Sequence, residues 1–119
     1  MNPPAHDTTV RLNLNTHELR VGDIVHEYGM RVRLDNPPIV TQRERTVYAW
    51  GGDVLNPDEV IAAGVVPRSF LGDHYWIDGT GWQWFQTNKW TVQGNDLARW
   101  SVERSTVDQT TPDRDSRTE

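Results

Sequence analysis

The chain contains no cysteine. This absence excludes a disulfide framework, thiolate catalysis and a zinc site built on cysteine. Long apolar runs are missing too, since none approaches the roughly 20 residues that a membrane-spanning helix needs. The N-terminus lacks the charged segment and apolar core of a signal peptide. From these absences we expect a cytoplasmic protein that has no membrane partner.

Apolar residues are also scarce, and neither acidic nor basic residues are in large excess. Hydrophobic residues make up 35% of the 119 residues, and the formal net charge is −5. Residues 9–104 carry a net charge of −2, and the two ends carry the remaining −3. A nearly neutral body lacks the electrostatic footprint of a non-specific nucleic-acid binder. We expect one domain over residues 9–104, with disordered tails at 1–8 and 105–119, which contain almost nothing to bury.

Alternating apolar and polar residues predict a mainly β fold. Residues 10–14 and 30–34 each place their apolar side chains on one face, as half-buried strands do. Residues 46–50 predict a third strand. Pro37 and Pro38 cannot donate ladder hydrogen bonds and should follow the end of the second strand. Gly51 and Gly52 are expected to close the third. The pattern favours a small antiparallel SH3-like barrel, or a strongly bent sheet, with one short helix.

The helix is predicted to begin after Asn56. Asn56 can cap it, Pro57 suits its first position, and Glu59 stands where a capping box needs an acidic residue. Gly64 is placed to end the helix in the left-handed conformation. A helix of about two turns is stable only when it is docked on the sheet.

Five of the six tryptophans lie between residues 76 and 100. Asp78 and Gly79 predict a tight hairpin turn among them. A second hairpin is predicted near residues 94–96, where a three-residue loop would pair Trp90 with Trp100 on an apolar face. A two-residue loop would instead set Trp90 against Arg99. Because burial enforces register, we expect Trp90 and Trp100 to pack together inside the domain.

Several blocks of the sequence resemble a group of small proteins from actinobacterial phages and prophages, for which no function is assigned. The resemblance covers most of residues 19–104, and its blocks are residues 19–26 (LRVGDIVH), 29–34 (GMRVRL), 54–56 (VLN), 66–71 (VPRSFL) and 90–100 (WTVQGNDLARW). The last block is the most specific. The resemblance implies a phage origin and expression inside a bacterial host cell, and it implies no activity, cofactor or catalytic residue.

No pattern of residues predicts catalysis. Neighbouring His and Glu residues on a strand point to opposite faces, so a metal site would need residues from separate strands, for example His26, His74 and Asp73. The carboxylates of Asp73 and Asp78 flank an aromatic segment, but aspartate is common in turns. The serines lack a nucleophile-elbow pattern. We therefore expect a protein that is not an enzyme and needs neither a metal nor another cofactor.

The candidate contact residues are aromatic and basic. Trp82 and Trp84 share one strand face while Phe85 lies on the other, so an aromatic should be exposed. The leading hypothesis is a non-enzymatic accessory protein that binds a host or phage protein through these tryptophans and an arginine-bearing strand. The alternative is a nucleic-acid-binding barrel in which aromatic rings stack on bases. The candidates for the two functions are Trp82, Trp84, Arg31, Arg33, Tyr48 and Tyr75. The identity of the partner and the oligomeric state are left open.

Overall fold

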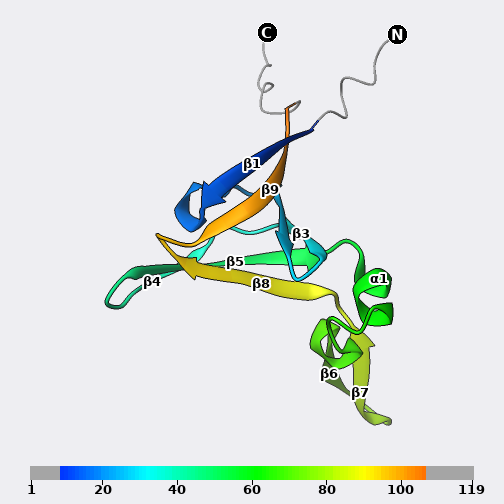
Figure 1. The fold of residues 1–119 in the computed structure, drawn as a ribbon. Coiled ribbons are helices and arrows are strands. Elements are labelled where there is room, and N and C mark those ends of the chain that lie inside the picture. The colour runs from blue at the N-terminus through cyan, green and yellow to red at the C-terminus, as the bar shows by residue number, and fades with distance from the viewer. Residues whose placement is uncertain (1–8, 107–119) are drawn as a thin grey trace, which may run out of the picture.

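The computed structural model describes residues 9–106, so the tail predicted at 1–8 and residues 107–119 of the tail predicted at 105–119 lie outside this range. Ser105, predicted to lie in that tail, is instead the last residue of a strand. The described chain is mainly antiparallel β with one short α-helix, as predicted (Figure 1). The body is a seven-stranded sheet formed by β1 (Thr9–Asn15), β2 (Ile24–Glu27), β3 (Met30–Leu34), β4 (Ile39–Gln42), β5 (Thr46–Val54), β8 (Lys89–Asn95) and β9 (Arg99–Ser105).

The long strand β5 organises this sheet. One of its edges pairs with β8, and the other pairs first with β4 and then with β3. From β3 the order continues through β2 and β9 to β1. The described strands form a bent sheet that does not close into a barrel, so the second of the two expected architectures is the one observed. Strands β8 and β9 are joined by a turn and run apart from it (Figure 1).

The core lies inside the bend. Met30, Val32 and Leu34 are all buried, so the predicted alternation of β3 is confirmed. The other core residues come from β2, β5, β8 and β9, from the segment before β2, and from the helix and the segment after it: Leu19, Val25, Trp50, Val54, Val60, Val66, Leu71, Val92 and Val102.

Gly51 and Gly52 do not close β5, contrary to prediction, because the strand continues to Val54. A Cβ atom at Gly52 would stand 2.6 Å from the carbonyl oxygen of Arg33 and 2.8 Å from Cγ1 of Val32. The absence of a side chain lets β5 and β3 approach closely at the bend. The glycine marks a close backbone contact, which the sequence alone does not distinguish from a turn.

The predicted hairpin between Trp90 and Trp100 is wrong. β8 pairs with β5, where Trp90 lies opposite Gly52, and β9 pairs with β1, where Trp100 lies opposite Leu14. The chain changes direction between β8 and β9, because each of the two strands pairs with a strand that is distant in the sequence. Both indoles are half-buried against the core.

The indole N–H groups of these two tryptophans are satisfied by different elements. Trp90 Nε1 donates to Glu27 Oε1 at 3.0 Å. Trp100 Nε1 donates at 2.9 Å to Oγ1 of Thr16, the first residue of the short 3₁₀ helix η2 (Thr16–Glu18). Each tryptophan therefore fixes its own strand to a separate neighbour.

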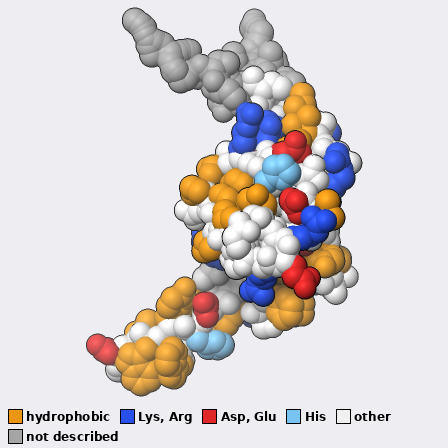
Figure 2. All heavy atoms as spheres, turned by 90° about the vertical axis from the view of Figure 1, so that its left-hand side faces the viewer, with side chains coloured by type: hydrophobic (Ala, Val, Ile, Leu, Met, Phe, Trp, Pro, Cys, Tyr) orange, Lys and Arg blue, Asp and Glu red, His pale blue; other side chains and the backbone are white. Residues whose placement is uncertain are grey.

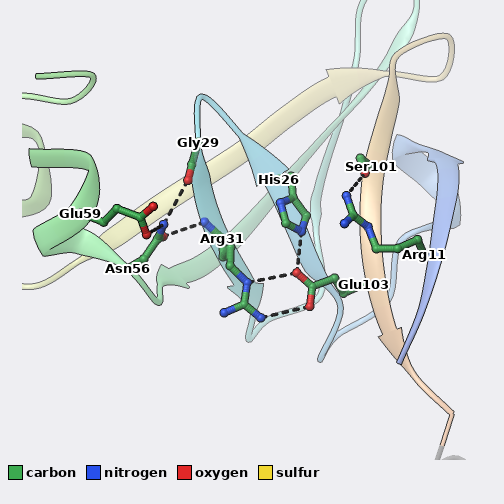
Figure 3. A network of polar contacts seen from close by, with 8 residues as sticks. All are labelled: Arg11, His26, Gly29, Arg31, Asn56, Glu59, Ser101 and Glu103. Carbon is green, nitrogen blue, oxygen red and sulfur yellow. Dashed lines mark hydrogen bonds and ion pairs between the residues drawn. The ribbon is translucent and has the colours of Figure 1, made fainter. Parts of the chain in front are cut away.

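The predicted helix is present as α1 (Pro57–Ala62), and Gly64 has the expected positive φ of +74°. Asn56 does not cap it through its side chain. Its Oδ1 instead accepts from the backbone N–H of Arg31 at 2.9 Å, and its Nδ2 donates to the carbonyl of Gly29 at 3.1 Å and to Glu59 Oε1 at 3.0 Å (Figure 3). The asparagine ties the start of the helix to β3.

A second, two-stranded sheet projects from the body. It consists of β6 (Gly72–Ile77) and β7 (Gly81–Gln86), and it follows the 3₁₀ helix η3 (Arg68–Leu71). We call residues 72–86 the arm. The turn spans the three residues between Ile77 and Gly81, one more than the two-residue turn considered above, and Gly79 and Gly81 both have positive φ. Figures 1 and 2 show the arm extending away from the bent sheet.

Candidate binding surface

The arm presents aromatic side chains on both of its faces. In the observed register Trp76 lies opposite Trp82, which places the two indoles on the same face as Trp84. The other face carries Tyr75, Ile77 and Phe85, because side chains alternate along each strand.

These rings are exposed to an extent that is unusual for a folded domain. Trp82 retains 67% of its accessible surface and Trp76 retains 59%, while Tyr75 and Phe85 on the opposite face retain 48% and 45%. The Trp76 and Trp82 rings meet edge to face with centroids 5.8 Å apart. Both faces of the hairpin therefore expose apolar surface, and Figure 2 shows a cluster of hydrophobic side chains on the arm.

Trp84 has a different role from Trp82, although the two share a face. Its ring is half-buried and lies beneath the guanidinium of Arg68, whose Cζ is 4.3 Å from the ring centroid. The same ring covers Gly72, where no space is left for a Cβ atom. Trp84 thus packs at the base of the arm and leaves Trp82 and Trp76 to present the outer surface.

Backbone hydrogen bonds fix the base of the arm to the body. The carbonyl of the fully buried Leu71 accepts from the backbone N–H groups of Thr87 and Asn88, at 2.8 and 2.9 Å. The carbonyl of Asn88 in turn accepts from Val54 at the end of β5, at 2.8 Å. The arm is therefore held at its root and exposed beyond it.

The arm is acidic. Residues 72–86 contain Asp73 and Asp78 and no lysine or arginine. Asp78 Oδ1 accepts from Trp76 Nε1 at 3.1 Å, so one carboxylate lies beside the exposed indoles. A partner that fits this surface would combine apolar groups with positive charge.

The predicted contact residues divide between the arm and the body. The structure brings Tyr75, Trp82 and Trp84 together on the arm. It places Tyr48 on β5, half-buried against the core, with its ring centroid 6.0 Å from that of His17. Sequence analysis did not select Trp76 and Phe85 as contact residues. The hairpin turn at Asp78 and Gly79 is the signal that would have placed them beside the residues it did select.

Arg31 on β3 is engaged within the body. Its Nε and Nη2 donate to the two carboxylate oxygens of Glu103, each at 3.0 Å, and His26 Nε2 lies 2.6 Å from Glu103 Oε2 (Figure 3). The hydrogen bond from Arg31 is the main reason that the pKa of Glu103 lies below its ordinary value. Arg31 is thus half of a structural ion pair, whereas Arg33, two residues along the strand, is exposed.

The residues considered for a metal site do not come together in the part of the chain that the structure describes. No group of three or more His, Asp and Glu side chains in residues 9–106 is arranged to hold a metal ion. Of the residues considered for such a site, His26 lies beside Glu103 on the body, while His74 and Asp73 lie on the arm. Asp73 and Asp78 are separated by the length of β6.

None of the helices described is both long and apolar enough to cross a membrane.

Comparisons with protein-family models, with curated proteins and with solved structures find no match to this chain.

Proposed function

We propose that the chain is a non-enzymatic binding protein that docks onto another protein through its arm. The observation that carries this proposal is the exposure of large aromatic side chains on both faces of the hairpin, with Trp82 at 67% and Tyr75 at 48%. Contiguous exposed apolar surface of this kind marks interaction sites in soluble proteins. Tryptophan and tyrosine are also enriched among the residues that dominate binding energy at interfaces.

The marginal stability of the arm supports the same conclusion. An isolated two-stranded hairpin is only marginally stable in water, and a third strand or a packed face is needed to stabilise it. Beyond its root the arm has neither, because its strands pair only with each other among the described residues. A partner that covers the arm would supply the missing burial.

The charge distribution favours a protein over a nucleic acid. Contacts to phosphates come largely from lysine and arginine, and the arm carries neither. Arg31, a candidate for contact with phosphate, is held by both carboxylate oxygens of Glu103. The proposed partner is accordingly a host or phage protein in a bacterial cell, with the phage origin implied by the sequence resemblance alone.

The test is capture of partners from a bacterial host lysate with the tagged full-length chain, its Trp82→Ala variant and an Ile39→Ala control. Ile39 is 73% exposed on β4, so the control removes exposed apolar surface from the body instead of the arm. We expect a protein that survives nuclease treatment to be captured by the wild type and the control. The Trp82 variant should bind it about 30-fold more weakly, the usual effect of removing a dominant contact residue.

Equal capture by all three chains would contradict the proposal. Loss of capture on nuclease treatment, together with a steep dependence on salt, would support the nucleic-acid alternative instead.

A further inference from the structure

The face of the arm that carries its three tryptophans binds a cation at its root. The strand register places Trp76, Trp82 and Trp84 on this one face, which we call the tryptophan face. The guanidinium of Arg68 lies over the Trp84 ring, with its Cζ 4.3 Å from the ring centroid. The π face of an aromatic ring is negative and attracts a cation. The chain itself therefore shows one kind of group that this face accepts.

Farther from the root, the tryptophan face has no cation of its own. Trp82 lies two residues from Trp84 along β7, a distance of roughly 7 Å in a strand. Trp82 and Trp76 are both more than half exposed, and no arginine or lysine of residues 9–106 lies over either ring. The arm supplies no such side chain, because residues 72–86 contain neither arginine nor lysine. The exposed rings are thus available to a cation from another molecule.

A carboxylate lies beside the two exposed rings. Asp78 Oδ1 accepts from Trp76 Nε1 at 3.1 Å, and the Trp76 and Trp82 rings meet edge to face. Because this bond uses one carboxylate oxygen, Oδ2 can accept from another donor. A guanidinium suits the arrangement, since its planar group can stack on an indole while an N–H group donates to a carboxylate. Lysine suits it less well, because its ammonium group is not planar.

The charge around these residues is unbalanced in the direction that favours a cationic partner. Residues 55–88 include α1, η3 and the arm, and they contain four carboxylates, one arginine and no lysine. The carboxylates belong to Asp58, Glu59, Asp73 and Asp78, and the arginine is Arg68. The rest of residues 9–106 contains nine lysines and arginines and eight acidic residues. The negative charge of the described chain is therefore concentrated in the segment that contains the arm.

We propose that the arm binds a basic surface of its protein partner, and that an arginine of this surface stacks on the Trp76–Trp82 pair beside Asp78. The inference rests on the proposed function and deepens it, because it names the chemistry of the partner. The bound arginine repeats, on the outer part of the tryptophan face, the contact that Arg68 makes with Trp84 at the root. The partner also removes water from the stacked groups, which strengthens the attraction between cation and ring.

The proposal can be tested without the partner. The probes are three blocked tripeptides that present arginine, lysine or citrulline between two glycines. Citrulline has nearly the same shape as arginine and carries no charge. Each peptide is titrated into the ¹⁵N-labelled full chain while NMR follows the indole N–H signals of the tryptophans.

We expect the arginine peptide to shift the signals of Trp76 and Trp82 in a saturable manner. The signal of Trp50 should stay unchanged, because this indole is buried and donates to the carbonyl of Thr16. The lysine peptide should bind about threefold more weakly than the arginine peptide, since it lacks the planar group. The citrulline peptide should bind at least about fivefold more weakly, since it lacks the charge.

Matched substitutions separate the two faces of the arm. Asp78→Asn removes a charge but keeps an oxygen that can accept from Trp76, and it should weaken binding of the arginine peptide about fivefold. Asp73→Asn removes the same charge from the opposite face, where Asp73 pairs with Phe85, and it should change binding less than about twofold. Trp82→Leu keeps an apolar side chain without a π face and should weaken binding at least about fivefold.

The backbone amide signals of β6 and β7 report whether each variant keeps the arm formed. If Asp78→Asn opens the arm, the comparison of the arginine and citrulline peptides on the wild-type chain decides the proposal. Equal binding of these two peptides would overturn it. An equal loss of affinity in Asp73→Asn and Asp78→Asn would also overturn it, because the effect would then be one of net charge alone.

Failure of this inference and failure of the proposed function give different results. If the arginine and citrulline peptides bind equally while Trp82→Ala still loses the captured protein, the arm is a docking surface and only the arginine contact is wrong. If the peptides behave as expected while capture does not depend on Trp82, the proposed function is wrong, and the assignment of the arginine to the captured protein is wrong with it.

Discussion

The body and the arm are both built from antiparallel strands with alternating side chains, yet they bury those side chains very differently. On the body, Val25, Val32 and Val102 are completely buried because the sheet bends over them. On the arm, no second layer from residues 9–106 covers either face, and Trp76 and Trp82 remain more than half exposed. The comparison shows that the same strand pattern can form a core or a contact surface. The outcome depends on whether another element packs against it.

The polar interactions differ in the same way. The body encloses ion pairs such as Arg104 with Asp23, in which the Asp23 side chain is only 2% exposed. The arm has a cation–π contact at its root and a hydrogen bond between Trp76 and Asp78 near its turn. Substitutions in the body should therefore change global stability. Substitutions in the arm should change local order or binding.

The largest effect is expected at the buried ion pair of the body. Replacing Arg104 with Met leaves the Asp23 carboxylate without its two guanidinium hydrogen bonds, both 2.8 Å long. An uncompensated buried charge typically costs about 3–5 kcal/mol, so the free energy of unfolding should fall by that amount in urea denaturation. Arg11→Met is the matched control, because Arg11 bonds Ser101 on the exposed surface. A change below about 1 kcal/mol for Arg104→Met would contradict the structural role of the pair.

A smaller effect on the body follows from Glu103 and depends on pH. Because the hydrogen bond from Arg31 lowers the pKa of Glu103 in the folded protein, its contribution is fully present above the ordinary pKa of 4.5. It is lost as pH falls through the lower, folded value. At pH 7 Glu103→Gln should destabilise the protein by about 2 kcal/mol, since hydrogen bonds to charged groups are lost.

The measurement is urea denaturation of both proteins from pH 7 downward. The difference between wild type and Glu103→Gln should shrink as the pH falls below 4.5, because Glu103 in the unfolded chain takes up a proton at a higher pH than Glu103 in the folded protein. A difference that stays constant across this range would show that the charge of Glu103 contributes nothing.

A substitution at the root of the arm should unfold the arm and leave the body folded. In Gly72→Ala the new methyl group meets the Trp84 ring and the carbonyl of Phe85, and Trp84 must leave its place under Arg68. Overpacking of this kind costs about 1–3 kcal/mol, enough to open a hairpin of marginal stability. Hydrogen exchange should show lost protection in β6 and β7 and unchanged protection in β5. Gly79→Ala is the control for the turn, because open space surrounds Gly79 and only its positive φ opposes a side chain.

The smallest effect on stability should come from the outer surface of the arm. Trp82→Ala removes a ring that is 67% exposed, so the free energy of unfolding should change by no more than about 0.5 kcal/mol. Trp84→Ala, at the root, should destabilise the arm more than Trp82→Ala does, since it removes a packed ring. Thermal denaturation of the two variants, monitored by tryptophan fluorescence, measures the difference between their stabilities. Equal effects would mean that Trp82 and Trp84 do not differ in role.

Local sequence patterns predicted the mainly β fold, the position of the helix and the buried face of β3. These features follow from local physics, because alternation and the placement of proline and glycine act over a few residues. The shared face of Trp82 and Trp84 is local for the same reason. The Asp78–Gly79 region was correctly identified as a turn, although its length differed by one residue.

Only the tertiary structure decided which strands pair and which aromatics stay exposed. The segment from Trp90 to Trp100 predicts a hairpin because strands that are adjacent in the sequence usually pair with each other. In the fold each strand instead completes the ladder of a distant one. Gly52 is required by the close approach of two strands, and Arg31 is held by Glu103 from a strand 72 residues away. The exposure of the arm likewise depends on contacts between distant parts of the chain. Whether an apolar face is covered depends on the packing of the whole chain, and no short segment contains that information.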